Sequence, residues 1–301
     1  MSFIETSPGI QLNYEDWGAG KPLVLIHGWP LDLQSFEHQM TELPLQGIRC
    51  IAYDRRGFGK STKPWSGYDY DTLADDLASF LEKLDLRDVT LAGFSMGGGE
   101  VVRYFSRHKG KRVSKAVLIS SVTPFMLKTG DNPSGTDRSV FDDMLAKLKA
   151  DRPAFLTSFG KQFFGTGLLT PSVSSAYLDW VRDLALAASP KATLDCVRAF
   201  SETDFRGEMG TINVPTLIIH GDADKTVPMA AAGDAASRLV PNSRFLVYPG
   251  AAHGLIHTDR ERLNQDLADF VLGRDLRTEV AAGAAELAVG AGLSELGLPI
   301  T

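Results

Sequence analysis

The stretch VTLAGFSMGGGE, residues 89–100, joins a short apolar run to a glycine-rich turn with one serine near its centre. Residues 93–97 match the pattern GxSxG, in which a serine occupies a strained turn between a strand and a helix and larger flanking residues would clash. The residues before the motif favour a strand, and GGEVVRYFSRH (98–108) favours a helix. We therefore interpret Ser95 as a nucleophile, rather than as part of a turn that serves packing alone.

Comparable apolar runs recur along the chain and alternate with helical segments. They occupy residues 22–28, 48–54, 89–94, 115–121, 215–221 and 243–250. Continuous apolar runs that end in turn residues are typical of buried parallel strands. Residues 71–86 place leucines and a phenylalanine on one face of a predicted helix. The alternation predicts an α/β fold with a mostly parallel, twisted sheet flanked by helices.

One long segment, residues 123–210, contains no convincing strand and is rich in aromatic residues. We interpret it as a helical lid inserted into a core made of residues 1–122 and 211–274, because long excursions between strands often cover active sites. Ordinary helices packed on the sheet are the alternative. Residues 275–301 are rich in alanine and glycine and are expected to form a tail.

Composition excludes several classes of protein. The formal net charge is −6, which provides no basic surface for nucleic acid or anionic membranes. The N-terminal residues do not form a secretory signal, and no apolar stretch is long enough to span a bilayer, so we expect a cytoplasmic protein. Cys50 and Cys196 lack metal-ligand spacing and are expected to be buried free thiols. We expect neither a metal nor a cofactor.

A nucleophilic serine needs a base, and the base needs an acid that orients it. His253 follows a strand end in YPGAAHGLIH (248–257) and is the predicted base, with His257 as the alternative. Asp222 and Asp224 both lie at the tip of the preceding strand. An oxyanion hole also requires a backbone N–H from the loop after an early strand, and LIHGWP (25–30) offers that of Trp29.

With these motifs in place, the chain resembles the α/β-hydrolase fold and, more narrowly, the bacterial cofactor-free haloperoxidases, perhydrolases and arylesterases. The resemblance covers about residues 3–274, and the tail after Arg274 departs from it. Four stretches carry it: DWGAGKPLVLIHGWP (16–30), IAYDRRGFGKSTKPW (51–65), GFSMGGGEVVRY (93–104) and ETDFRGEMGTINVPTLIIHGDADKTVP (202–228).

The resemblance implies a role for each matching residue. Ser95 would be the nucleophile, His253 the base and Asp224 the orienting acid, while the N–H groups of Trp29 and Met96 would form the oxyanion hole. The acyl pocket would be lined by Trp29, Phe125, Phe159, Phe163, Thr226 and Met229. Packing within the lid is the alternative for the aromatic residues.

The implied reaction is two-step acyl transfer on a small carboxylic ester. Water would release an acid, and hydrogen peroxide would release a peracid able to oxidise halide without metal or haem. HGWP with proline is the form associated with perhydrolases, so perhydrolysis is expected. The resemblance also implies a homo-oligomer, either a trimer or a hexamer.

Three alternatives remain at this point. The same group contains lactonases and γ-lactamases, which the sequence does not separate from esterases. DRRGFGKST (54–62) partly matches a phosphate-binding loop, but Asp54 stands where that pattern requires glycine. A hydrolase fold used only for ligand binding is the third alternative.

Overall fold

The computed structural model describes residues 2–167 and 172–276, and in these residues the strands form one eight-stranded sheet. Its order is β1-β2-β4-β3-β5-β6-β7-β8, antiparallel at β1 and β2 and parallel from β4 onward. The strands are β1 (Ser2–Ser7), β2 (Ile10–Trp17), β3 (Lys21–Ile26), β4 (Ile48–Tyr53), β5 (Val89–Phe94), β6 (Val113–Ile119), β7 (Thr216–Gly221) and β8 (Ser243–Tyr248). The predicted α/β class is confirmed.

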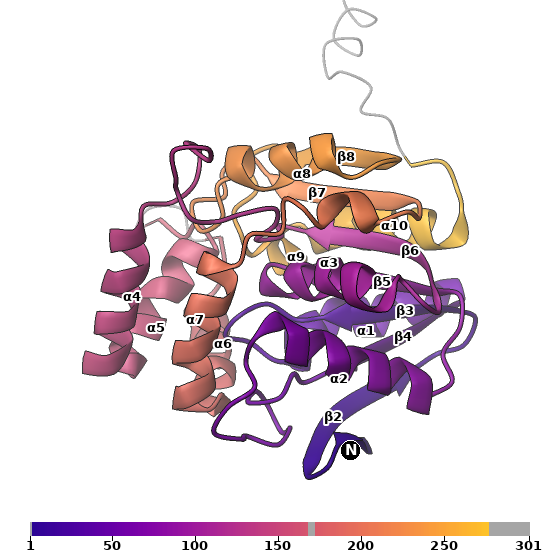
Figure 1. The fold of residues 1–301 in the computed structure, drawn as a ribbon, viewed down its shortest axis with the longest axis horizontal. Helices are drawn as coiled ribbons and strands as arrows, with labels where there is room; N and C mark the ends of the chain where they lie inside the picture. Colours follow the sequence, from indigo (N-terminus) through magenta and orange to yellow (C-terminus); the bar gives the residue numbers. More distant parts are fainter. Residues whose placement is uncertain (1, 168–171, 277–301) are drawn as a thin grey trace, which may run out of the picture.

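Helices cover both faces of this sheet (Figure 1). One face carries α2 (Tyr70–Lys83), α3 (Met96–His108) and α8 (Gly233–Leu239), and the other carries α1 (Glu37–Glu42), α9 (Leu255–Thr258) and α10 (Arg260–Leu272). Because successive side chains of a strand point to opposite faces, Val24 and Ile26 join the first core while Leu23 and Leu25 join the second. Burial on both faces explains why these strands are continuous apolar runs.

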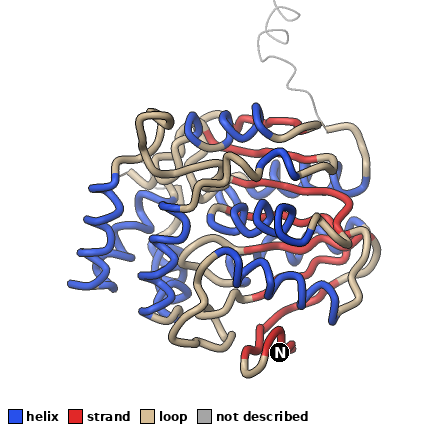
Figure 2. Tube along the Cα trace, in the orientation of Figure 1, coloured by secondary structure: helices blue, strands red, loops and turns tan. Residues whose placement is uncertain are grey.

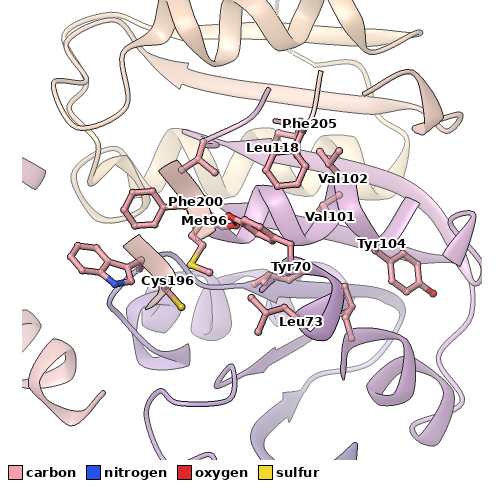
Figure 3. Packing of buried hydrophobic residues seen from close by; sticks show 14 of the residues in the cluster. Tyr70, Leu73, Met96, Val101, Val102, Tyr104, Leu118, Cys196, Phe200 and Phe205 are labelled. Atoms are coloured by element: carbon pink, nitrogen blue, oxygen red, sulfur yellow. Dashed lines mark hydrogen bonds between the residues drawn. The ribbon is translucent and has the colours of Figure 1, made fainter. Parts of the chain in front are cut away.

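The face that carries α3 is filled by large side chains from distant parts of the chain, as Figure 3 shows. Tyr70 and Leu73 of α2 lie against Met96 and Val101 of α3. The Tyr70 hydroxyl donates a hydrogen bond to the Met96 carbonyl oxygen at 3.1 Å. This packing fixes the start of α3, which directly follows Ser95 in the chain.

Between β6 and β7 the described residues form four α-helices: α4 (Arg138–Ala150), α5 (Arg152–Phe163), α6 (Ser175–Ala187) and α7 (Pro190–Glu202). Figure 2 shows them gathered at one end of the sheet. The side chains of Asp151, Ser174 and Ser189 cap the N-termini of α5, α6 and α7. We call this unit the cap; the interpretation of residues 123–210 as a lid over the active site stays a prediction.

Short 3-10 helices complete the described chain: η1 (Leu33–Phe36), η2 (Leu43–Gln46), η3 (Met209–Thr211) and η4 (Met229–Ala231). Among residues 2–167 and 172–276, no helix has the length and apolar character that a membrane span requires. The predicted tail lies outside the described residues from position 277 onward.

Candidate active site

Ser95 occupies a sharp turn between β5 and α3, with φ 54° and ψ −118°. A non-glycine residue rarely adopts such a backbone, and holding it there stores about 1–3 kcal/mol of strain. The flanking glycines make the turn sterically possible. A Cβ at Gly93 would lie 2.4 Å from the Gly97 carbonyl oxygen, and a Cβ at Gly97 would lie 2.3 Å from that of Ile26.

Backbone hydrogen bonds hold this turn in place. The Ser95 N–H donates to the Ile119 carbonyl oxygen at 2.9 Å, and the Ser95 carbonyl oxygen accepts from Gly98 at 3.0 Å and Val122 at 3.2 Å. These partners come from β6, from α3 and from the segment after β6. The strained conformation is therefore supported from several sides, as a fixed nucleophile position requires.

The predicted serine, aspartate and histidine follow β5, β7 and β8 and meet at the carboxyl edge of the sheet. His253 Nε2 lies 2.9 Å from Ser95 Oγ, and His253 Nδ1 lies 2.6 Å from Asp224 Oδ2. All three residues are buried, with exposed fractions of 6%, 1% and 6% for Ser95, His253 and Asp224. If Ser95 donates its proton to Nε2, the ring must carry its own proton on Nδ1, facing the carboxylate.

Asp222 and His257, the alternatives to the predicted acid and base, lie elsewhere. Asp222 Oδ1 accepts a hydrogen bond from the Gly250 N–H at 2.6 Å, so its carboxylate ties two loops together. His257 lies on α9, where its Nδ1 is 3.0 Å from His38 Nε2. Asp224, not Asp222, therefore lies beside the imidazole, and His253, not His257, lies beside Ser95.

The carboxylate of Asp224 is held in one orientation and kept ionised. Its Oδ1 accepts hydrogen bonds from the N–H groups of Thr226 at 2.9 Å and Val227 at 2.8 Å. Burial works to raise the pKa of Asp224, but the neighbouring His253 and His220 hold that pKa well below its usual range. Asp224 is therefore a fixed negative charge beside Nδ1 of the histidine.

Aromatic rings hold the imidazole of His253 from two sides. The Phe94 ring centroid lies 5.2 Å away at an interplanar angle of 34°, and the Phe163 ring meets it edge-on at 4.8 Å. These rings restrict the orientation of the imidazole and keep water from its faces. The surroundings suit a base that moves a proton between two oxygen atoms.

Two backbone N–H groups were predicted to form an oxyanion hole beside Ser95. Met96 is the first residue of α3, so its N–H has no partner within the helix. Trp29 follows Gly28, whose Cβ position would lie 3.0 Å from Cβ of Ser95. The indole Nε1 of Trp29 donates to the Thr193 carbonyl oxygen at 3.0 Å, which fixes this loop against the cap.

A buried ionic network, which we did not predict from the sequence, supports the same loop. Arg55 donates from Nη2 to the His27 carbonyl oxygen at 2.7 Å and from its backbone N–H to His27 Nε2 at 3.0 Å. Its Nε forms a buried ion pair with Glu100 of α3. Burial and Arg55 lower the pKa of His27 well below its ordinary value. The network links the Trp29 loop to the helix that follows Ser95.

A cavity of about 320 Å³ lies over Ser95 and His253 and extends under the cap. Its lining consists of Trp29, Ser95, Val122, Met126, Thr136, Val140, Phe141, Asp143, Met144, Lys147, Phe155, Ser158, Phe159, Gln162, Phe200, Lys225, Thr226, Val227 and His253. Three predicted pocket residues, Trp29, Phe159 and Thr226, are among them. Phe155 and Phe200 were missed, although the spacing of Phe155 and Phe159 on one helix face was a usable signal.

The other three predicted pocket residues lie outside this lining. Phe163 packs its ring against His253. The Phe125 ring lies under the Arg206 guanidinium, at 5.1 Å from its centroid. Met229 begins η4, in the loop region after β7. Apolar side chains that point away from the cavity pack against other parts of the protein.

Comparisons with known proteins agree with this fold. The family described as alpha/beta hydrolase fold matches residues 21–259. The chain is 40% identical to a non-heme chloroperoxidase of Kitasatospora aureofaciens and 39% identical to a bifunctional esterase/perhydrolase of Acinetobacter calcoaceticus. Each match covers 90% of this chain and 99% of the relative. A crystal structure of bromoperoxidase from Bacillus anthracis is similar at 46% identity and a TM-score of 0.87, covering 90% of this chain and 99% of that one.

Proposed function

This chain belongs to the α/β-hydrolase fold family, and we propose that it is a serine hydrolase that cleaves small carboxylic esters through an acyl-enzyme on Ser95. The observation that carries the proposal is the buried line of hydrogen bonds from Ser95 Oγ through His253 to Asp224. A serine hydroxyl becomes a nucleophile when such a base and acid are aligned with it.

In the first half of the reaction, Ser95 Oγ attacks the carbonyl carbon of the ester while its proton moves to His253 Nε2. The carbonyl oxygen gains negative charge, which the N–H groups of Trp29 and Met96 stabilise. The C–O bond to the alcohol then breaks, and the leaving oxygen takes the proton from Nε2. Asp224 stays ionised and stabilises the imidazolium that forms between these two transfers.

In the second half, a small nucleophile enters the place that the alcohol has left. Water loses a proton to His253 Nε2 and attacks the acyl carbon, and Ser95 Oγ leaves with that proton, which releases a carboxylic acid. Hydrogen peroxide follows the same steps and releases a peracid. A peracid transfers its outer oxygen and proton to a halide ion, which gives hypohalous acid and the carboxylate, so the oxidation needs no redox group in the protein.

The size and lining of the cavity support small substrates. About 320 Å³ suits a short acyl chain or a small aromatic ester, near the lower limit of typical ligand pockets. Phe155, Phe159 and Phe200 provide an apolar wall for that group. The relatives named chloroperoxidase and esterase/perhydrolase support including the peroxide reaction in the proposal.

Two assays test the two halves of the proposal separately. The parent should release p-nitrophenol from p-nitrophenyl acetate, and Ser95→Ala should reduce kcat by about 10³-fold or more. Ser237→Ala is the control, because that hydroxyl only bonds the Asp234 carbonyl oxygen on α8. Adding peroxide should produce peracetic acid, detected by oxidation of methyl p-tolyl sulfide.

The outcomes are distinct. If peracid forms at the same rate with Ser95→Ala as with the parent, it arises without the enzyme. If the parent hydrolyses the ester but forms no peracid above that level, the peroxide reaction is contradicted and the ester hydrolysis stands. A parent that is inactive on esters from acetate to octanoate would contradict the hydrolase proposal.

A further inference from the structure

Two histidines and a glutamate that the proposed reaction does not use converge between α1 and α9. His38 Nε2 lies 3.0 Å from His257 Nδ1 and 3.5 Å from Glu37 Oε1. One donor atom from each of the three residues lies within 4.8 Å of the other two. We propose that Glu37, His38 and His257 bind a divalent metal ion of the zinc type, with water completing its coordination.

The separations between the donor atoms match those around such an ion. Zinc binds imidazole nitrogen at about 2.0–2.1 Å and carboxylate oxygen at about 2.0–2.2 Å. Ligands at those distances, at angles between a right angle and tetrahedral, lie about 3.0–3.4 Å from one another. The two contacts of His38 Nε2 are close to this range. An ion therefore fits after small side-chain rotations, without movement of the helices.

The two helices that supply the ligands are already tied together. Gln39, next to His38, donates from Nε2 to the carbonyl oxygen of Ile256 at 3.0 Å and to Asn264 Oδ1 at 2.9 Å. Asn264 Nδ2 lies 3.5 Å from the His38 carbonyl oxygen. Hydrogen bonds thus hold the chain beside both histidines, so binding an ion requires little further ordering.

An aromatic stack orients the second histidine. The Tyr177 ring of α6 lies on the face of His257, with centroids 3.6 Å apart and an interplanar angle of 18°. The Phe164 ring meets His257 at a steeper angle, at 6.2 Å. Ring nitrogens bind metals in the plane of the ring, so a stack on the face fixes that plane and leaves Nδ1 available.

Charged side chains close to the three residues act in both directions on a bound cation. Arg260 opposes a bound cation, whereas Glu37 and, close to His38, Glu42 favour one.

A bound ion would join the core to the segment that carries the proposed base. Glu37 and His38 belong to α1, whereas His257 is four residues after His253. Because such an ion binds the folded chain and finds no assembled site in the unfolded chain, it should raise the melting temperature. At a metal concentration of 100 times Kd, the expected rise is about 4 °C.

The test is a titration of the metal-stripped full chain with ZnCl₂, followed by calorimetry and by thermal unfolding. We expect one saturable zinc per chain and the rise in melting temperature. His38→Gln and His257→Gln should each weaken binding at least 10-fold and remove most of the rise, and Glu37→Gln should weaken binding less. His108→Gln is the control, because that histidine of α3 contacts Asp75 of α2 and the Tyr104 ring and is not one of the three proposed ligands.

Circular dichroism and unfolding without metal establish that each variant folds. If His257→Gln does not fold, His38→Gln and Glu37→Gln still decide the question. A parent without saturable zinc binding overturns the proposal, and so does zinc binding as tight in His38→Gln as in the parent. Binding that is lost in His253→Gln but kept in His38→Gln places the ion at the proposed active site, which also overturns it.

Discussion

Replacing Gly97 with alanine tests whether the close approach of α3 to β3 positions the nucleophile. The added Cβ would lie 2.3 Å from the Ile26 carbonyl oxygen and 3.1 Å from that of His27. Cβ atoms essentially never approach other atoms below 3.0 Å, so the two backbones must separate by about 0.7 Å or more. Ile26 is paired with both neighbouring strands, so we expect α3 and Ser95 to move instead.

The size of this displacement sets the expected loss. A reacting group that is misplaced by about 1 Å loses about 10²-fold in rate. Gly97→Ala should therefore lower kcat for p-nitrophenyl acetate by about 30- to 100-fold. Overpacking of this kind destabilises a protein by about 1–3 kcal/mol, which for a chain of this length predicts a fall in melting temperature of about 2–5 °C.

The assay compares kcat, KM and melting temperature with those of Gly207→Ala. No atom lies within 4 Å of the Cβ position at Gly207, so this control should leave all three quantities unchanged. Gly97→Ala with more than a third of the parent kcat and an unchanged melting temperature would refute the steric explanation of the turn.

Three other substitutions have defined outcomes. Asp224→Asn removes the charge beside His253 Nδ1 and should lower kcat/KM for p-nitrophenyl acetate by about 10³–10⁴-fold, with a near-parental value contradicting the assignment. Burial and Asp54 raise the pKa of Asp32 to about 7 in the folded protein. The contribution of Asp32 to folding stability is therefore fully present below the unfolded pKa of about 3.9 and is lost as pH rises through 7. The melting temperature of Asp32→Asn relative to the parent should therefore increase from pH 5 to pH 8, whereas a difference independent of pH would contradict that pKa. Phe155→Ala enlarges the cavity and should raise the kcat/KM ratio of p-nitrophenyl hexanoate to acetate about 10-fold, and an unchanged ratio would remove Phe155 from the acyl pocket.

Strands that are buried on both faces could be predicted from the sequence because nothing interrupts their apolar runs. β3 and β5 are of this kind. β2, IQLNYEDW, was not predicted, because it lies near the edge of the sheet and keeps partly exposed polar residues. How much of a strand is exposed to solvent depends on its position in the sheet, and this position cannot be inferred from the local composition.

The positions of the candidate catalytic residues were predictable for a similar reason. Ser95, Asp224 and His253 each follow a parallel strand, and the carboxyl ends of parallel strands meet at one edge of the sheet. Asp222 follows the same strand as Asp224, so the choice between these two came from the family resemblance. Distances between side chains were not predictable, nor was the lining of the cavity, because the direction of each cap side chain depends on how the helices dock. Phe159 and Phe163 illustrate this, since they share α5 but only Phe159 lines the cavity.

Contacts between residues far apart in the chain had no local signal. Arg55 and Glu100 are charged residues that composition assigns to the surface, yet they form a buried pair beside the Trp29 loop. His38 and His257 are 219 positions apart and come together only because α1 and α9 are adjacent in the fold. The Arg55–Glu100 pair and the His38–His257 pair therefore form only in the folded tertiary structure.

The most direct test of the central claim is to trap the nucleophile of the folded protein with diethyl p-nitrophenyl phosphate and to map the adduct by peptide mass spectrometry. We predict one diethylphosphoryl group per chain, on Ser95, formed in proportion to the loss of esterase activity and absent from Ser95→Ala. Loss of activity with Ser95 unmodified, or an adduct on another residue that accounts for that loss, would contradict the proposed mechanism.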